Sequence, residues 1–355
     1  MSILHICNTF FDYELSHLSF PSLKNAFDQH EVFLQLQFLP FLFASKEDGV
    51  AVSFIPEDSF WQRLKAFNIS APHLHLIEDG KFPLYQSLDV WGHSPTILKW
   101  AKKKQLSYQM PPWSIVQTVN SKEFSFQACP LPGGKLIHNE EELQQWLKTI
   151  KGEGVLKTCF GAAGAGHLLF KEFDFNKIRA FAEKEWKEKR AIIGEPWVNR
   201  ILDFSTQWEI SKTKEIKGLG MTLCENDFKG RYRRNRVGDS AKLFGPHLEM
   251  VKEQQQFVQK ILSKIAELGY FGNVGIDAMI YKTENGSLQL HPIVEINARK
   301  TMGWAALAIQ QKHFPGKDLQ LAFTKKEGAG ILPSFALRQN GSKVKFSRYL
   351  ELEIT

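Results

Sequence analysis

The feature that most constrains this chain is a candidate hairpin in its last third, between Gly275 and Gly303. Two strand-like runs flank an Asn-Gly pair at 285–286, which is typical of a hairpin turn. Because side chains alternate across a strand, Glu295, Asn297 and Arg299 share one face of the second run, opposite apolar neighbours. An acid and an amide suit a hard cation, which prefers oxygen ligands, and the guanidinium suits an anion beside it.

Asp277, on the first run, joins this set only if its side chain points to the same face. A two-residue loop at the Asn-Gly pair places Asp277 opposite Val294, on the wrong face. An odd-length loop, such as a three-residue turn with a glycine bulge, places it opposite Glu295. The metal-site hypothesis therefore predicts that Asp277 pairs with Glu295. A solvent-exposed polar face on an edge hairpin is the alternative.

A second feature is a lysine, Lys157, that ends a short strand at 154–157 and precedes a glycine-rich loop. The loop reads Gly-Ala-Ala-Gly-Ala-Gly over 161–166. An ammonium group holds a phosphate as a point charge, and backbone amides without bulky side chains can close on the phosphates. Neither a Walker A loop nor a dinucleotide fingerprint occurs here. A flexible hairpin with small residues is the alternative.

A third feature is the segment Ile-Ile-Gly-Glu-Pro-Trp-Val at 192–198, followed by Asp203. An extended segment offers backbone groups to the edge of an adenine, and a nearby carboxylate can bind ribose hydroxyls. Taken alone, this segment is more simply explained as a buried strand that ends at a proline.

The order of elements predicts where these features lie. Up to residue 110, short apolar runs alternate with amphipathic stretches, which favours an α/β unit with a parallel sheet. Ser94 is the expected N-cap of a helix at 95–104, and Asn139 that of a helix at 139–149. Strands dominate after residue 200, around one long helix expected at 248–268, and a second Asn-Gly turn is expected at 340–341.

Composition and charge exclude several classes of protein. Hydrophobic residues make up 43% of the chain, including 28 Phe, which argues for filled cores rather than disorder. A net charge of +7 favours anionic ligands without requiring nucleic acid. The four cysteines form no Cys-x-x-Cys pair, so neither a zinc site nor a disulfide framework is indicated. Without a signal peptide or a bilayer-length apolar run, a cytoplasmic protein is expected.

Three motifs follow one another along the chain: a lysine with a glycine-rich loop, then Glu-x-x-Val, then a distant Asp with Glu-x-Asn-x-Arg. Their order resembles that of the ATP-grasp superfamily, from about residue 119 to 303. The resemblance implies a mixed α/β and α+β fold. A small N-terminal α/β (pre-ATP-grasp) domain would cover 1–112. An ATP-grasp N-terminal lobe with a glycine-rich lid would cover 113–200, and a C-terminal lobe with the metal site 201–355.

The resemblance also implies roles for individual residues. The expected ATP-binding residues are Lys122, Lys157, Gly164, Gly166, Glu195, the backbone of Trp197 and Val198, and Asp203, with Glu209 as the alternative ribose acid. The expected metal ligands are Asp277, Glu295 and Asn297. Arg299 would be catalytic, stabilising the transferring phosphoryl group or the substrate carboxylate.

The implied activity is an ATP- and Mg²⁺-dependent ligation, with two ions, or Mn²⁺ in their place. A carboxylate would be activated as an acylphosphate and joined to an amine, less often to a thiol. The partners are small molecules rather than a membrane or nucleic acid, and a homodimer is an open alternative. No general base is assigned. Two other functions stay open: a nucleotide-binding regulatory module without catalysis, and nucleic-acid binding through the basic segment 229–236, for which a plain solvated loop is the simpler reading.

Overall fold

The computed structural model describes residues 2–16, 20–161, 166–172, 174–227, 230–337 and 341–355. The chain forms two compact units, each assembled from separate stretches of sequence. Unit 1 comprises Met1–Trp113, Arg234–Leu243 and Arg299–Thr355, and unit 2 comprises Ser114–Arg233 and Phe244–Ala298. The domain boundaries expected from the sequence stay a prediction.

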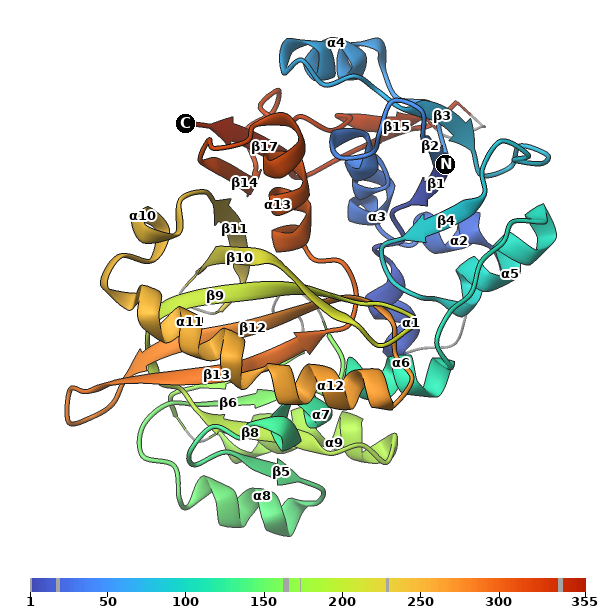
Figure 1. Ribbon diagram of the computed structural model, residues 1–355. Coiled ribbons are helices and arrows are strands. Elements are labelled where there is room, and N and C mark those ends of the chain that lie inside the picture. Colours follow the sequence, from blue (N-terminus) through green and yellow to red (C-terminus); the bar gives the residue numbers. More distant parts are fainter. Residues whose placement is uncertain (1, 17–19, 162–165, 173, 228–229, 338–340) are drawn as a thin grey trace. The chain divides into compact units, whose positions relative to one another are not determined.

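Four parallel strands form a sheet in unit 1, in the order β3-β2-β1-β4 (Figure 1). They are β1 (Ile3–Ile6), β2 (Gly49–Val52), β3 (His73–Leu76) and β4 (Ser87–Val90). The helices of this part are α1 (Phe11–Ser16), α2 (Leu23–Phe27), α3 (Glu31–Leu36), η1 (Leu39–Leu42), α4 (Asp58–Ala66) and α5 (Pro95–Lys104). The predicted parallel α/β unit is confirmed, including the cap of α5, where Ser94 accepts a hydrogen bond from the N–H of Ile97.

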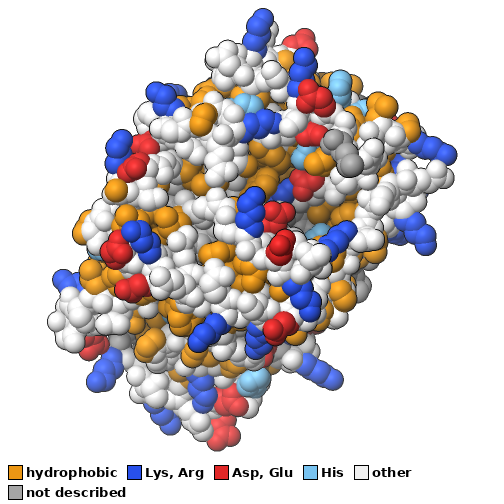
Figure 2. All heavy atoms as spheres, viewed as in Figure 1, with side chains coloured by type: hydrophobic (Ala, Val, Ile, Leu, Met, Phe, Trp, Pro, Cys, Tyr) orange, Lys and Arg blue, Asp and Glu red, His pale blue; other side chains and the backbone are white. Residues whose placement is uncertain are grey.

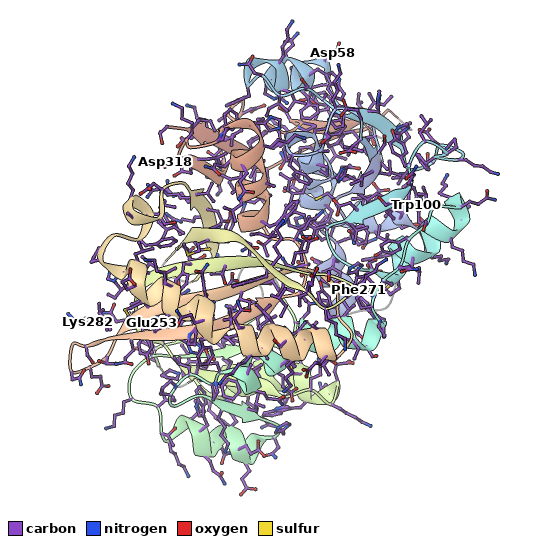
Figure 3. All side chains as sticks on the ribbon, in the orientation of Figure 1. Asp58, Trp100, Glu253, Phe271, Lys282 and Asp318 are labelled. Atoms are coloured by element: carbon purple, nitrogen blue, oxygen red, sulfur yellow. The ribbon has the colours of Figure 1, made fainter. Side chains whose placement is uncertain are left out.

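Aromatic side chains fill the core of unit 1. Phe10, Phe27 and Phe38 are fully buried, and the rings of Phe10 and Phe27 meet edge to face with centroids 5.2 Å apart. Trp100 lies on α5, where it is labelled in Figure 3. Its indole N–H donates to the carbonyl of Ile77 at 3.0 Å. The many phenylalanines therefore pack a core, as the composition predicts.

The C-terminal stretch of the chain completes unit 1. It contains α13 (Met302–His313), β14 (Leu319–Thr324), β15 (Phe335–Leu337), β16 (Lys343–Lys345) and β17 (Tyr349–Ile354). Buried residues of α13, β14 and β17 belong to the same hydrophobic cluster as those of β1 and β2. β15 and β16 pair antiparallel, and Asn340 of the predicted turn between them lies outside the described residues.

Lys229 of the basic segment 229–236 lies outside the described residues, and the rest of the segment differs from the expected solvated loop. From Tyr232 onward it is a strand, β11 (Tyr232–Val237), whose residues Arg234–Val237 pair antiparallel with β14. Asn235 is buried, and Arg236 is exposed. Alternating burial along a paired strand accounts for this segment, because every second side chain faces away from the solvent.

All of α6 (Trp113–Val119) except Trp113 belongs to unit 2, which continues with α7 (Lys122–Ala128) and a four-stranded antiparallel sheet in the order β5-β8-β6-β7. Its strands are β5 (Lys135–Ile137), β6 (Gly154–Lys157), β7 (His167–Phe170) and β8 (Ile192–Pro196). α8 (Glu140–Leu147) and α9 (Phe175–Lys187) pack against this sheet. Asn139 caps α8 by accepting from the N–H of Glu142, as predicted.

Four longer strands complete unit 2 in the antiparallel order β13-β12-β9-β10. They are β9 (Asn199–Ile210), β10 (Ile216–Asn226), β12 (Gly272–Lys282) and β13 (Leu288–Asn297). The single long helix expected at 248–268 is instead two, α11 (Leu248–Phe257) and α12 (Gln259–Glu267), which run end to end along the sheet (Figure 1). The interruption is Val258, whose ψ of −11° departs from helical geometry although i→i−4 hydrogen bonds continue on both sides.

Two short helices precede α11 in the sequence, α10 (Ser240–Phe244) and η2 (Gly245–His247). Within the described ranges, no helix combines the length and apolar composition needed to span a membrane.

Candidate functional site

The hairpin of β12 and β13 pairs Asp277 with Glu295, which is the register that the metal-site hypothesis predicts. The turn between Thr283 and Ser287 contains three residues, and the N–H of Thr283 donates to the carbonyl of Ser287 at 2.9 Å. Gly286 ends the turn with a φ of +88°, the left-handed region that favours glycine. An odd-length loop therefore puts both carboxylates on one face.

A bulge adjusts this register between the turn and the two acids. Met279 pairs with His291, whereas Asp277 pairs with Glu295, so β13 contributes two more residues than β12 between these pairs. Pro292 lies in that stretch. Because proline has no backbone N–H to donate, the regular ladder is interrupted at this point.

The outer edge of β13 is held by side chains from other elements of unit 2. The Ser125 hydroxyl, on α7, accepts from the N–H of Ile296 at 3.0 Å. Asn120 accepts from the N–H of Ala298 at 2.8 Å, and the Tyr270 hydroxyl donates to the carbonyl of Ala298 at 2.6 Å. These bonds fix the backbone on both sides of Asn297, so the candidate metal ligands stand on a braced strand.

Lys122 joins this strand to the glycine-rich loop. Its ammonium lies 2.5 Å from Oε1 of Glu295 and donates to the carbonyl of Gly161 at 2.7 Å. The lysine side chain is 6% exposed and the glutamate side chain 23% exposed, so the cation is the more deeply shielded partner. The N–H of Lys122 also donates to the carbonyl of Cys159 at 2.9 Å. A predicted phosphate lysine and a predicted metal ligand therefore touch directly.

A second buried ion pair joins Lys157 and Glu195. The ammonium lies 2.5 Å from Oε2 of Glu195, and the two side chains are 12% and 8% exposed. The neighbouring strands β6 and β8 pair Lys157 with Ile193 and Val155 with Glu195, so the two charged side chains are offset along the ladder and reach each other diagonally across it. The predicted phosphate lysine and the predicted hinge acid are thus brought together.

Of the predicted lid glycines, Gly164 lies outside the described residues and Gly166 can be placed. Gly166 has a φ of +80°, and a Cβ atom there would clash with the hydroxyl oxygen of Thr158. The N–H of Thr158 donates to the carbonyl of Gly166 at 2.9 Å, which closes the base of the loop. Both the backbone conformation and the close approach require glycine at this position.

The predicted hinge continues from β8 into β9. The N–H of Trp197 donates to the carbonyl of Glu153 at 2.9 Å, and the Arg200 guanidinium lies over the Trp197 ring, 5.4 Å from its centroid. Arg200 also donates to Oδ1 of Asp203 at 2.8 Å. This link connects Asp203 to the hinge, whereas Glu209 is an exposed residue six positions further along β9.

Oxygen donors gather on the hairpin face. Oδ2 of Asp277 accepts from Nδ2 of Asn297 at 3.0 Å, and Glu295 stands opposite Asp277. Two carboxylates and an amide are a set that fits a hard cation such as Mg²⁺, which usually keeps several further positions for water and phosphate. The described part of the chain contains no group of three or more His, Cys, Asp or Glu residues arranged for a metal, so a cation bound here would need Asn297 as its third ligand.

Arg299, the predicted catalytic residue, belongs to unit 1 by its contacts. Its Nε donates to Oδ1 of Asp12 at 2.8 Å, and a terminal nitrogen donates to the carbonyl of Lys300 at 3.1 Å. The Arg299 side chain is 12% exposed. The guanidinium is therefore held in one orientation by an acid that the sequence reasoning did not identify.

Two histidines, the partly buried His167 and the buried His291, lie in the electrostatic field of the two lysine–glutamate ion pairs. Burial lowers the pKa of His167 to about 3, and the positive charges of Lys122 and Lys157 act in the same direction. Burial lowers the pKa of His291 to about 4, with Lys157 contributing in the same direction against an opposing effect of Glu195. Both imidazoles are neutral at pH 7. Sequence reasoning missed them, although the position of His167 directly after the glycine-rich loop was a usable signal.

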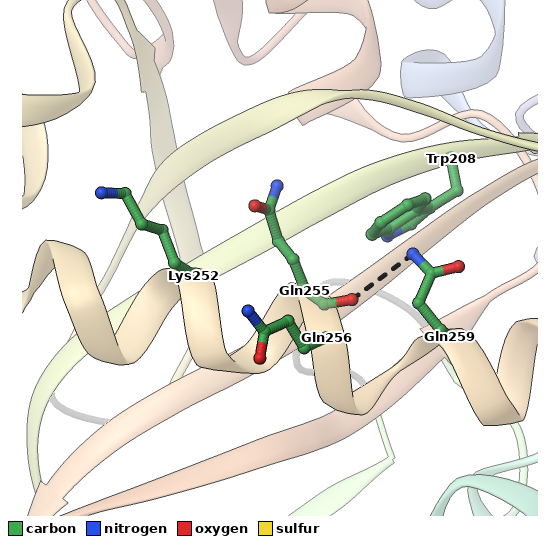
Figure 4. Close-up of a pocket in the computed structure, with 5 residues that line it drawn as sticks. All are labelled: Trp208, Lys252, Gln255, Gln256 and Gln259. Atoms are coloured by element: carbon green, nitrogen blue, oxygen red, sulfur yellow. Dashed lines mark hydrogen bonds between the residues drawn. The ribbon is translucent and has the colours of Figure 1, made fainter.

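A separate depression of about 420 Å³ lies between β9 and the helices α11 and α12 (Figure 4). Its lining residues are Trp208, Lys252, Gln255, Gln256 and Gln259. No carboxylate or glycine-rich loop is among them, so this depression lacks the groups that a magnesium–nucleotide site requires. On the face of the molecule seen in Figure 2, side chains of both charges are interspersed, without an extended basic area.

No protein-family model matches the sequence, and no curated protein matches it either. Solved structures do match. Phosphoribosylamine–glycine ligase from Thermotoga maritima aligns with a TM-score of 0.58 at 12% identity, covering 99% of this chain and 92% of that one. N5-carboxyaminoimidazole ribonucleotide synthetase from Thermus thermophilus aligns with a TM-score of 0.53 at 14% identity, covering 99% and 92%.

A third match is the biotin carboxylase domain of Hydrogenobacter thermophilus 2-oxoglutarate carboxylase, a dimer solved with MgADP, ADP and bicarbonate. It aligns with a TM-score of 0.52 at 13% identity and covers 100% of this chain and 85% of that one. The likeness extends over nearly the whole chain in all three comparisons. At these identities it establishes the fold.

Proposed function

Because the chain has the ATP-grasp fold, we propose that it is an ATP- and Mg²⁺-dependent ligase that joins a carboxylate substrate to an amine through an acylphosphate. One observation carries the proposal. Two buried lysines and two acids from distant parts of the sequence meet in unit 2, as the pairs Lys122–Glu295 and Lys157–Glu195. An ATP site needs this concentration of cationic groups beside carboxylates that can hold a metal.

The nucleotide contacts that we propose come from four segments of unit 2. Lys122 and Lys157 bind the phosphates, Glu195 with the backbone of Trp197 and Val198 binds the adenine, and Asp203 binds the ribose. The loop with Gly164 and Gly166 closes over the phosphates. The hydrogen bonds of Arg200 to Asp203 support this choice of ribose acid over Glu209, because they tie Asp203 to the hinge.

The Lys122–Glu295 pair suggests how the site is prepared for its ligand. A buried ammonium next to a carboxylate is already desolvated, so its electrostatic effect on an incoming phosphate is strong. As phosphate oxygens reach the ammonium, Lys122 exchanges its carboxylate partner for them. Glu295 then becomes available to the cation, together with Asp277 and Asn297. Lysine and acid thus keep each other's charge balanced until the ligand arrives.

The cation, as two Mg²⁺ ions or Mn²⁺ in their place, would supply charge neutralisation and alignment for phosphoryl transfer. The chain supplies the rest. Lys122 and Lys157 hold the phosphates, and Arg299 stabilises charge on the transferring phosphoryl group or orients the substrate carboxylate. Closure of the glycine-rich loop excludes water, which would otherwise hydrolyse an acylphosphate.

The reaction that we propose has two displacements. A carboxylate oxygen of the substrate attacks the γ-phosphorus of ATP, the bond to the β-phosphate oxygen breaks, and ADP leaves. The amine nitrogen then attacks the acyl carbon, phosphate leaves, and the nitrogen loses a proton to give the amide. No general base is assigned for that proton. The carboxylate and the amine are small molecules, and we place the reaction in the cytoplasm, which the scattered cysteines without a Cys-x-x-Cys pair support.

Calorimetric titration with MgATP tests the proposal. Wild type should bind, and Glu295→Ala should lose most of the Mg²⁺-dependent affinity. Glu215→Ala, which removes an exposed acid from the turn between β9 and β10 of the same sheet, serves as the matched control and should bind as wild type does. The proposal fails if wild type binds no MgATP, or if Glu295→Ala binds and turns over normally.

A second experiment separates a ligase from a nucleotide-binding module without catalysis. ATP-dependent phosphate release is measured with panels of amino acids and peptides as carboxylates, each with and without amines. A ligase releases phosphate only with its substrates, and the active pair identifies them. Binding of MgATP with no release for any pair would favour the regulatory module instead.

A further inference from the structure

His167 is a partly buried histidine, and the two ion pairs described above leave no role for it. Its Nε2 atom is inaccessible to solvent and has no hydrogen-bond partner among the described residues. A buried polar atom without a partner is destabilising, because it has lost its hydrogen bonds to water and gained none in return. Its presence therefore calls for an explanation outside the stability of the ligand-free protein.

The position of His167 supplies that explanation. It is the first residue of β7, directly after Gly166, and it pairs with Lys157 in the antiparallel ladder of β6 and β7. Residues paired in this way have side chains on the same face of the sheet. The charged groups that act on its imidazole come from four elements: Lys122 on α7, Lys157 on β6, Glu295 on β13 and Arg200 on β9.

Three of these four groups are cations, so the surroundings of His167 oppose a further positive charge. Burial lowers its pKa to about 3, and Lys122 and Lys157 add to the effect. The imidazole is consequently neutral in the ligand-free protein at pH 7. A polyphosphate brings several negative charges and many acceptor oxygens to the same place. Both deficits of the site, the excess positive charge and the unpartnered nitrogen, are removed by this one class of ligand.

We propose that His167 is a third phosphate-binding side chain of the nucleotide site, and that its Nε2–H donates a hydrogen bond to the polyphosphate held by Lys122 and Lys157. This inference rests on the proposed function. Because the ligand offsets the charge of the two lysines, the imidazole takes up a proton when the polyphosphate binds, and the hydrogen bond becomes charge-assisted.

A purely structural histidine has different consequences. If His167 stabilised the fold, its replacement by an apolar side chain would lower the melting temperature. If the unpartnered nitrogen instead binds a ligand, its removal should not lower the melting temperature. His167→Leu should then melt at the same temperature as wild type or higher, and should bind the nucleotide less tightly.

The test uses the full chain and calorimetric titration with MgATP at pH 7, in two buffers of different ionisation enthalpy. Wild type should take up a fraction of a proton on binding. His167→Leu should bind roughly tenfold more weakly and take up none. His167→Gln keeps an amide donor but cannot ionise, so it should recover most of the affinity without the proton. His138→Gln, at an exposed histidine of the same unit, is the matched control and should behave as wild type does.

Titration with adenosine and with magnesium tripolyphosphate locates the contact on the ligand. The loss in His167→Leu should appear with tripolyphosphate and be absent with adenosine. Equal losses with both would overturn the inference, as would unchanged MgATP affinity in His167→Leu, or proton uptake that persists in both variants.

These outcomes are distinct from failure of the proposed function. If wild type binds no MgATP, the ligase proposal fails and this inference fails with it. If wild type binds and turns over and the His167 variants match it, only the role of His167 is lost.

Discussion

Lys122 and Glu295 are 173 residues apart in the chain, yet the ammonium of Lys122 lies 2.5 Å from a carboxylate oxygen of Glu295. The contact joins the start of α7 to the strand that carries the candidate metal ligands. One partner is assigned to the phosphates and the other to the cation. A ligand that engages either partner must therefore separate them, which couples the two halves of the proposed site.

Replacing one member of this pair should destabilise the fold. Lys122→Met leaves a carboxylate without its cation, and the free energy of unfolding should fall by about 2 kcal/mol, below the usual cost for a fully buried pair because Glu295 is partly exposed. Glu295→Gln should cost a similar amount, and the double variant less than the sum of both. Urea unfolding of the four proteins measures the coupling. Both single variants should also lose affinity for MgATP.

The matched control is the pair of Lys252 and Glu249, which meet at 2.7 Å on α11 but are 50% and 77% exposed. Lys252→Met should change the free energy of unfolding by no more than about 0.5 kcal/mol, since exposed ion pairs contribute little. A Lys122→Met effect as small as that of Lys252→Met would contradict the role assigned to the buried pair.

Gly166→Ala should lower both stability and turnover. Its φ of +80° is strained for alanine, and the added Cβ would clash with the Thr158 hydroxyl. We expect a loss of roughly 2 kcal/mol in the free energy of unfolding and weaker closure over the nucleotide. Gly152→Ala separates the backbone strain from the clash with Thr158. Gly152 has a similar φ of +87°, but nothing lies within 4 Å of the Cβ atom that alanine would add there. Equal effects of the two variants on MgATP binding would contradict the assignment of Gly166 to the lid.

The hairpin shows what a sequence pattern can predict about this site. The alternation of Glu295 and Asn297 with apolar residues places them on one face, and the odd-length turn puts Asp277 on that same face. Both follow from the two-residue period of a strand. The bulge at Pro292, by contrast, could not be placed in advance. Proline indicates an interrupted ladder, but not how many extra residues the bulge contains.

Tertiary contacts account for what the sequence did not predict. Nothing local to Ser125 or Asn120 indicates that their side chains hold the edge of β13, because their partners lie more than 170 residues away. The ion pairs of the two lysines depend in the same way on distant strands. The basic segment 229–236 was expected to be solvated on composition alone, whereas its part from Tyr232 onward is a strand, held by the pairing of Arg234–Val237 with β14.

Arg299 should be needed for turnover and not for nucleotide binding. Arg299→Lys keeps the charge but loses the planar fork of donors, so kcat with the substrates found by the phosphate-release screen should fall roughly 10²-fold. The affinity for MgATP should stay within about threefold of wild type. Arg236→Ala, at an exposed arginine of β11, is the control and should leave kcat unchanged. If Arg299→Lys raised KM for the carboxylate with kcat unchanged, Arg299 would bind substrate rather than stabilise the transferring group.

His291 should make the stability of the protein depend on pH. It is 4% exposed, and burial lowers its pKa to about 4, against about 6.5 in an unfolded chain. Between these two values the unfolded chain binds a proton at this residue that the folded protein does not. The free energy of unfolding therefore falls as the pH decreases through this window, by at most about 3 kcal/mol from His291 alone. Above pH 6.5 the contribution is constant.

His291→Gln removes the titrating group, so the dependence of the free energy of unfolding on pH should become shallower by about one proton. The pKa of His167 is also lowered, to about 3, so this residue preserves part of the slope in the variant. Urea unfolding of both proteins at about pH 7.5, 5.5 and 4.5, on either side of the unfolded-chain pKa, measures the difference. The curves should diverge below pH 6.5, with the variant losing less stability than wild type. Parallel curves across that window would mean that His291 is accessible to protons in the folded protein, and would contradict its burial beside Lys157.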